Sequence, residues 1–149
     1  MVKTLELQMT TPEKIALQAK ADFVVLPALK GEMGILPGHE PFLVQLHPGE
    51  VRVTSGEDVQ SFAVSGGFAE VKDDKVLLFA ETAEMANAID AERARQALEK
   101  AKTRLTGAEI DPLSLAQAEA AIRRAQVRLR VSQLNRGHGR NRPAPETHD

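Results

Sequence analysis

The sequence predicts an α+β protein of two domains, in which an N-terminal antiparallel β-sandwich precedes an antiparallel two-helix hairpin. Apolar residues alternate with period two in the first part and then recur every three or four residues. Of the 18 glycines and prolines, 12 fall within residues 1–86. The same part carries 7 basic and 13 acidic side chains, whereas residues 87–149 carry 12 basic and 8 acidic ones. We therefore expect a sandwich over 1–86, a hairpin over 87–135 and a disordered basic tail over 136–149.

Short alternating segments predict the strands of the first domain. The alternating apolar residues are Leu5, Leu7 and Met9, then Val51 and Val53, then Phe62 and Val64, then Ala69 and Val71, and last Leu77 and Phe79. Period two is typical of strands that bury one face. Turn signals such as Pro37-Gly38, Pro48-Gly49 and Gly66-Gly67 separate these segments at short intervals, which favours hairpin connections and a sandwich.

Two helices are predicted from Asp90 onward. The apolar stripe of the first is Ala94, Leu98, Ala101 and Leu105, and that of the second is Leu115, Ala118, Ile122, Ala125 and Leu129. Asp90 is expected to cap the first helix, and Asp111, followed by Pro112, the second. The linker 106–110 is short enough to fold the helices back on each other. Because the stripes hold few large residues, we expect the hairpin to be marginal alone and able to move.

Several function classes are excluded by composition. The chain has no cysteine and four scattered histidines, so we expect no disulfide and no metal site. The glycine-rich segment 31–41 lacks the Gly-Lys-Ser/Thr ending of a phosphate loop, which favours structural turns. We find no nucleophile or acid/base pair with usable spacing and expect no catalysis. The N-terminus lacks a signal-peptide core, and no apolar stretch suits a bilayer span, so a cytosol-like compartment is expected.

Arginines dominate the end of the chain. They are Arg123, Arg124, Arg128, Arg130, Arg136, Arg140 and Arg142. No aromatic residue follows Phe79, which disfavours nucleic-acid binding because stacking platforms are missing. Contact with an acidic protein surface or an anionic ligand is the favoured interpretation, and a solvated basic face is the alternative.

Four segments taken together resemble the epsilon subunit of F-type ATP synthases. They are VLPA at 25–28, GEMGILPGHEP at 31–41, LHPG at 46–49 and VSGGFAEV at 64–71, followed by a two-helix hairpin. The resemblance covers residues 1–134. It implies a non-catalytic central-stalk (rotor) subunit that couples proton translocation to ATP synthesis, held at the cytoplasmic face of the bacterial inner membrane only through its complex.

The resemblance also implies partners. The sandwich is expected to bind the gamma subunit and the ring of c subunits, with Glu32, Gly34 and His39 as contacts. The hairpin is expected to extend along gamma toward the alpha and beta subunits and to inhibit ATP hydrolysis. The expected contacts with acidic segments of beta are Arg123, Arg124, Arg128 and Arg130. Glu40 departs from the small residue of relatives, so the contact near His39 is not expected to be an unchanged copy.

Some members of that family bind ATP on the compact hairpin. The matching residues here are Ile89, Asp90, Arg93, Ala94, Arg124 and Arg128. Arg124 and Arg128 share a helix face and suit phosphate oxygens, while Glu84 and Asp90 are expected to accept hydrogen bonds from the nucleoside. Lys100 replaces an arginine of strong binders and cannot form its bidentate fork. Regulatory ATP, without an obligatory metal, is therefore an expected ligand, and no other cofactor is expected. The alternative keeps Asp90 as a helix cap and the arginines as solvated or beta-binding charges.

A second function from a different class stays open. It is a free-standing cytosolic module whose basic hairpin binds an anionic ligand or nucleic acid, with the sandwich as scaffold. Stoichiometric co-purification with the stalk and catalytic subunits separates it from the rotor subunit.

Overall fold

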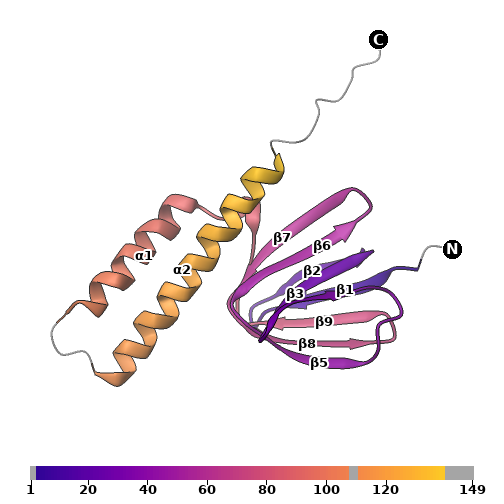
Figure 1. Cartoon of the computed structure of the whole chain (residues 1–149), viewed down its shortest axis with the longest axis horizontal. Helices are drawn as coiled ribbons and strands as arrows, with labels where there is room; N and C mark the ends of the chain where they lie inside the picture. The colour runs from indigo at the N-terminus through magenta and orange to yellow at the C-terminus, as the bar shows by residue number, and fades with distance from the viewer. Residues whose placement is uncertain (1–2, 108–110, 140–149) are drawn as a thin grey trace, which may run out of the picture.

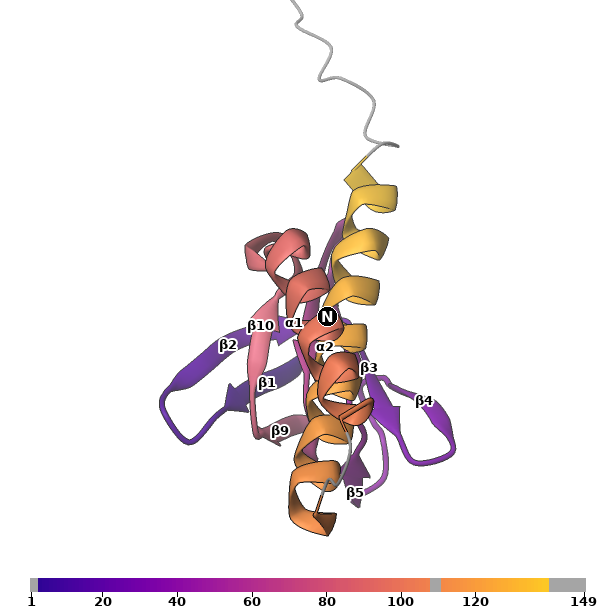
Figure 2. The same cartoon turned by 90° about the vertical axis from the view of Figure 1, so that its left-hand side faces the viewer.

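The computed structural model describes residues 3–107 and 111–139. It consists of a β-sandwich and a pair of helices that leans against it (Figure 1). Helix α2 runs between α1 and the sandwich, and a view turned by 90° shows α1 in front of α2 with the strands behind both (Figure 2). The fold class predicted from the sequence is confirmed.

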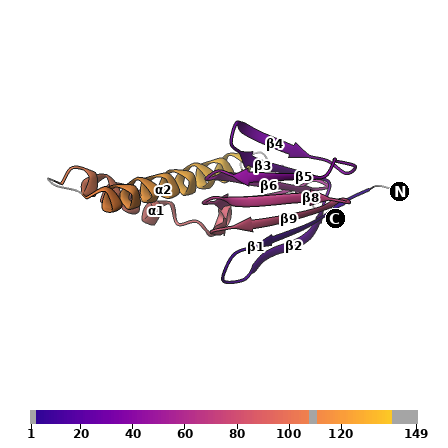
Figure 3. The same cartoon turned by 90° about the horizontal axis from the view of Figure 1, so that it is seen from below.

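Among the described residues, ten strands form the sandwich. Their bounds are β1 Leu5–Thr10, β2 Ile15–Ala21, β3 Phe23–Ala28, β4 Gly31–Ile35, β5 Phe42–Leu46, β6 Gly49–Ser55, β7 Asp58–Val64, β8 Gly67–Lys72, β9 Lys75–Ala80 and β10 Ala83–Met85. They are ordered β10-β7-β6-β3-β5-β8-β9-β1-β2, and β4 pairs with β3. A single pair, Ala28 with Leu46, joins β3 to β5, so the strands fold into two layers (Figure 3). Within 3–107, the strand pairs are antiparallel except β1 with β9, which is parallel.

The core lies between the two layers and follows the predicted alternation in most strands. Leu5, Leu7 and Met9 of β1 are fully buried, as expected from period two. In β9 the expectation is wrong, because Val76 and Leu78 face the core, whereas the predicted Leu77 and Phe79 face outward. The five consecutive residues from Val76 to Ala80 are all apolar, so no alternation with polar residues shows which face of the strand is buried.

The helices begin at the predicted caps. A short 3₁₀ helix, η1 Ala86–Ala88, leads to α1 Ala91–Leu105 and then to α2 Pro112–Gly139. Oδ1 of Asp90 accepts hydrogen bonds from the backbone N–H groups of Glu92 and Arg93 at 3.0 and 3.1 Å. Oδ1 of Asp111 likewise accepts from the backbone of Ser114 at 3.0 Å. These bonds satisfy N–H groups that a helix start leaves without a partner.

The second helix is longer than the sequence predicted. It ends at Gly139, whereas the hairpin was expected to end at 135 and a disordered tail to follow. No proline occurs between 113 and 142, and extending an existing helix is far less costly than starting one, so the helix continues through Gly137. The rest of the expected tail, 140–149, and most of the expected linker, 108–110, lie outside the described residues.

Small residues join the two helices. Ala94 and Ala101 of α1 and Ala118 and Ala125 of α2 are all buried, which lets the helix axes approach closely. Leu115, predicted in the same stripe, is exposed in the first turns of α2. The seam therefore buries little large apolar surface, as the narrow stripes indicated.

Candidate functional site

A cleft of about 290 Å³ opens where α2 leans on β7 and β10. Its walls come from the end of β7, from the segment entering β10, from one face of α2 and from one residue of α1. The lining residues are Ala63, Val64, Ser65, Thr82, Glu84, Ala97, Ala121, Arg124, Ala125, Val127 and Arg128. Because both domains supply walls, a molecule bound in the cleft would touch the sandwich and the hairpin together.

Strand register places Glu84 in this cleft. Glu84 of β10 lies opposite Ala63 of β7, and Ala63 lies opposite Glu50 of β6. Directly opposite residues point to the same face of a sheet, so the three form one row beneath α2. Ala63 is the smallest member of the row and is buried, with Val127 and Val131 of α2 packed in the same cluster.

Arg128 forms a bidentate ion pair with Glu84. Nε of Arg128 donates to Oε2 of Glu84 at 2.7 Å, and Nη2 donates to Oε1 at 3.0 Å. The two side chains are 32% and 33% exposed. The hydrogen bond to Glu84 raises the pKa of Arg128 above its ordinary value, burial opposes this rise, and the charges of Glu84 and Asp90 add to it. This bidentate geometry is the strong form of an arginine–carboxylate pair.

Arg124 lies one helical turn before Arg128 and lines the same cleft. Within the part of the chain that the structure describes, its guanidinium has no hydrogen bond or ion pair. The cleft thus holds one arginine that is already bound to a carboxylate and one that is available to an anion.

The remaining residues predicted for nucleotide binding lie outside the cleft lining. Asp90 caps α1 and reaches Arg128 only through its charge. Ile89 is buried with Ala86 and Val131, and Ala94 is buried in the helix seam. Arg93 is exposed on α1 and does not line the cleft. The structure therefore brings together Glu84, Arg124 and Arg128, and leaves Arg93 apart from them.

Two hydroxyl groups in the cleft were missed as site residues. Thr82 Oγ1 donates to Ser65 Oγ at 2.6 Å, and both residues line the cleft. The sequence favoured Ser65 as a turn residue before Gly66-Gly67, and it does lie in the turn between β7 and β8. Only the return of β10 beside β7, which the sequence did not specify, brings Thr82 next to it.

The predicted contacts of the sandwich lie on and beside β4, away from the cleft. Arg52 donates to Oε1 and Oε2 of Glu32 at 3.1 and 3.0 Å, so Glu32 is held in an ion pair. Gly34 packs against the ring of Phe23, where an added Cβ would lie 2.9 Å from the ring. Nδ1 of His39 lies 2.7 Å from the carbonyl oxygen of Glu40. The three predicted contacts therefore do not converge on one cavity.

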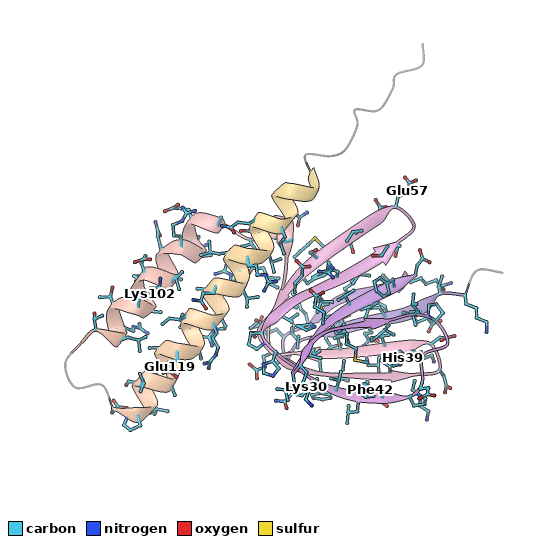
Figure 4. The ribbon with its side chains drawn as sticks, in the orientation of Figure 1. Lys30, His39, Phe42, Glu57, Lys102 and Glu119 are labelled. Carbon is cyan, nitrogen blue, oxygen red and sulfur yellow. The ribbon has the colours of Figure 1, made fainter. Side chains whose placement is uncertain are left out.

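His39 also has an aromatic neighbour. Its ring meets Phe42 edge-on at a centroid distance of 6.3 Å. Both side chains lie on the sandwich away from the hairpin, whereas the labelled Lys102 and Glu119 mark the helices (Figure 4). This loop is thus separated from the cleft by the body of the sandwich.

An exposed apolar face covers β5, β8 and β9. Phe68 and Phe79 stack with centroids 4.9 Å apart and are 49% and 39% exposed, the half-buried Leu77 lies two residues before Phe79 on the same face, and Leu43 lies across Glu70 from Leu77. Gly67 permits the approach of β8 to β9, because a Cβ there would overlap the carbonyl oxygen of Phe79. An exposed pair of stacked aromatic rings is typical of a surface that contacts another protein. The run of apolar residues in β9 was the sequence signal for this face.

Two classes of site find no support in the described ranges. Within residues 3–107 and 111–139, no three His, Asp or Glu side chains gather as a metal site requires. None of the described helices is long and apolar enough to cross a membrane.

Comparison with known proteins gives consistent matches over most of the chain. The family described as "ATP synthase, Delta/Epsilon chain, beta-sandwich domain" matches residues 4–86, and "ATP synthase, Delta/Epsilon chain, long alpha-helix domain" matches residues 87–133. The chain is 43% identical to the ATP synthase epsilon chain of Desulforamulus reducens over 135 residues, covering 89% of this chain and all of that one.

Two solved structures that resemble this chain are also parts of ATP synthases. A chain in the OSCP/F1/c-ring part of the Euglena gracilis mitochondrial ATP synthase superposes with a TM-score of 0.75 and 29% identity, covering 88% of this chain and 81% of that one. A chain of the central stalk and c-ring of the Tetrahymena thermophila mitochondrial ATP synthase gives a TM-score of 0.63 at 12% identity, covering 87% and 97%. The second likeness concerns the fold alone.

Proposed function

The chain belongs to the ATP synthase delta/epsilon family and is a non-catalytic subunit of the central stalk, and we propose that its hairpin is a nucleotide-sensitive brake on ATP hydrolysis. One observation carries this proposal. The cleft that holds Glu84, Arg124 and Arg128 is built from both domains, so occupation of the cleft and position of the hairpin are linked. A ligand that binds only the closed arrangement increases its population.

ATP is the ligand that we propose for the cleft. The free guanidinium of Arg124 suits phosphate oxygens, and Arg128 one turn later extends the cationic surface. The hydroxyls of Ser65 and Thr82 and the carboxylate of Glu84 supply polar partners for a nucleoside. In this proposal the arginines of the cleft bind the phosphates, and no metal ion is required.

The brake follows from the location of the arginines. Of the four expected contacts with acidic segments of beta, Arg124 and Arg128 line the cleft and Arg123 and Arg130 do not, and all but the half-buried Arg128 are exposed. In the compact arrangement Arg128 is therefore held on the sandwich by Glu84, and Arg124 borders the cleft between the two domains. Extension of the hairpin would present all four to an acidic surface and block hydrolysis, and electrostatic attraction would set its register.

The sandwich is proposed to bind the gamma subunit and the c-ring, and so to couple proton translocation to ATP synthesis. The exposed face around Phe68 and Phe79 supports a protein partner, which we propose is gamma. Glu32 and His39 are polar and accessible enough to meet the c-ring near β4. The chain would then lie at the cytoplasmic face of the bacterial inner membrane, attached through the complex.

Hydrolysis by the assembled synthase tests the brake. Complexes containing the full chain are compared with complexes in which the chain ends after Ala88, which retains β10 and η1. We expect the shortened chain to raise hydrolysis several-fold at equal amounts of assembled, proton-pumping complex. Equal rates would overturn the brake.

Equilibrium dialysis of the full chain tests the ATP site. Arg124→Gln should weaken ATP binding at least ten-fold, because it removes a charge-assisted contact in the cleft. Arg104→Gln is the matched control, since Arg104 is an exposed arginine of α1 outside the cleft. Equal affinities of the two variants would overturn this site.

A further inference from the structure

We infer that the Glu84–Arg128 ion pair is a latch that holds the hairpin on the sandwich in the absence of nucleotide and that must open before a phosphate can take both arms of Arg128. The first half concerns this chain alone. The second half rests on the proposed nucleotide site.

The pair joins the two domains close to the point where the chain leaves the sandwich and enters the hairpin. Glu84 is in β10, the last strand, only six residues before the cap Asp90 of α1. Arg128 is 44 residues further along, in the second half of α2. The pair therefore closes a loop that contains the connection, all of α1 and half of α2. Any movement that lifts this part of α2 from β10 must break both hydrogen bonds.

The apolar contact beside the pair is small. Val127 and Val131 of α2 meet Ala63, Ala86 and Ile89 in a cluster separate from the core of the sandwich. These side chains bury far less apolar surface than the sandwich core, so they leave the position of the hairpin sensitive to one strong polar contact. The buried alanines of the helix seam add little to this hold, because each has only a methyl group to bury.

Glu84 also occupies the groups that a phosphate would use. Nε and Nη2 of Arg128 form the flat edge that accepts a carboxylate or a phosphate in the same bidentate manner. Both are engaged by Glu84, whereas Arg124 is available. An incoming phosphate would thus meet Arg124 first and gain Arg128 only by displacing Glu84. The bound anion would then replace the contact that it breaks.

The latch can be tested on the full chain with spin labels, because the sequence has no cysteine to interfere. Glu57→Cys and Glu119→Cys place one label on the sandwich and one on α2, at exposed positions away from the cleft (Figure 4). Distances between the labels, measured without nucleotide by double electron–electron resonance, give the ratio of compact to extended chains. Into this background are placed Glu84→Gln, Arg128→Gln and the charge-exchanged pair Glu84→Arg with Arg128→Glu.

We expect each single variant to lower the compact-to-extended ratio about five-fold, a size in keeping with a partly exposed ion pair. The charge-exchanged pair should restore at least half of the loss. Arg95→Gln is the control, because it breaks an exposed ion pair with Glu92 on α1 and should leave the ratio unchanged. Single variants within two-fold of the parent, or an exchanged pair no better than the singles, would overturn the latch.

Inorganic tripolyphosphate and ATP separate the latch from the nucleotide site. If Glu84 competes with phosphate for Arg128, Glu84→Gln should strengthen tripolyphosphate binding to the full chain. Weaker or equal binding would overturn the displacement of Glu84 by phosphate. Distances that respond to Glu84→Gln but never to ATP would overturn the nucleotide site and support the latch. Distances that respond to ATP but not to Glu84→Gln would support the nucleotide site and overturn the latch.

Discussion

Glu50 and Glu84 lie in one row across β6, β7 and β10, with Ala63 between them. The arginine that pairs with Glu50 belongs to the sandwich, and the arginine that pairs with Glu84 belongs to the hairpin. Glu50 is held by Arg52 from its own strand at 2.9 Å, whereas Glu84 is held by Arg128 of the hairpin. One carboxylate of the row therefore stabilises the sandwich, and the other joins the sandwich to α2.

The buried carboxylate predicts a large effect of Arg52→Met. The side chain of Glu50 is only 8% exposed, and its Oε2 has no partner among the described residues, so Arg52 is the charge that compensates it. Removing that charge should lower the free energy of unfolding by about 2 kcal/mol. Glu32→Gln removes the other, 53% exposed partner of Arg52 and should cost less than about 1 kcal/mol.

Urea unfolding followed by far-ultraviolet circular dichroism measures both variants. Tryptophan fluorescence is no option, since the chain contains neither Trp nor Tyr. Equal losses for the two variants would show that Glu50 does not depend on Arg52.

The alanine seam predicts that Ala118→Leu separates the helices. Ala118 is fully buried where α1 and α2 approach, so a larger side chain overpacks the seam at a cost of about 1–3 kcal/mol. Ala116→Leu makes the same change on the exposed face of α2 and should be neutral. Limited trypsin digestion should cleave the hairpin several-fold faster in Ala118→Leu only. Similar cleavage rates in both variants would contradict a tight seam.

The sequence predicted that Arg128 shares a helix face with Arg124, but it did not predict that Arg128 pairs with Glu84. The spacing of Arg124 and Arg128 on one helix face was predicted and confirmed, because it depends only on the helical period. The pairing of Arg128 with Glu84 depends on how α2 is rotated against the sandwich. The predicted stripe ended at Leu129 and did not include Val131, which is buried with Ala63 and Ala86 where α2 meets the sandwich. Arg93, which was matched to the ATP-binding residues of the family, does not line the cleft.

Tertiary pairing also limited the prediction of the sandwich. Strands β1 and β6 bury the residues that period two selected, since each has one apolar and one polar face. Strand β8 also buries the predicted Ala69 and Val71, although its outward face carries Phe68. Strand β9 is apolar on both faces, because one side packs in the core and the other forms the exposed patch. Its parallel pairing with β1 joins segments about 70 residues apart, which local turn signals do not encode.

The cap of α2 predicts a residue-specific dependence on pH. The backbone N–H and the hydroxyl of Ser114 donate to the carboxylate of Asp111 and lower its pKa below the ordinary 3.8. A group whose pKa is lower in the folded state stabilises that state above its unfolded pKa. The stabilisation is lost as the pH falls through the folded pKa.

Carbon-detected NMR of the Asp111 carboxyl group checks this prediction. Its midpoint should lie below that of an aspartate in an unfolded peptide, and the amide signal of Ser114 should follow the same titration. Asp111→Asn retains an acceptor without a charge and should remove the step in the Ser114 signal. A midpoint at or above 3.8 would contradict the capping geometry.

The exposed aromatic pair predicts a separation of assembly from folding. Phe68→Ser should weaken binding to the proposed gamma subunit at least ten-fold, because buried aromatic anchors dominate protein interfaces. Both rings are already partly in water, so the free energy of unfolding should fall by only about 1 kcal/mol, mostly through the lost stacking with Phe79. Lys72→Ser, an exposed change at the end of the same strand, should leave co-purification with gamma intact. If Phe68→Ser co-purifies with gamma as well as Lys72→Ser does, the partner must bind another face of the sandwich.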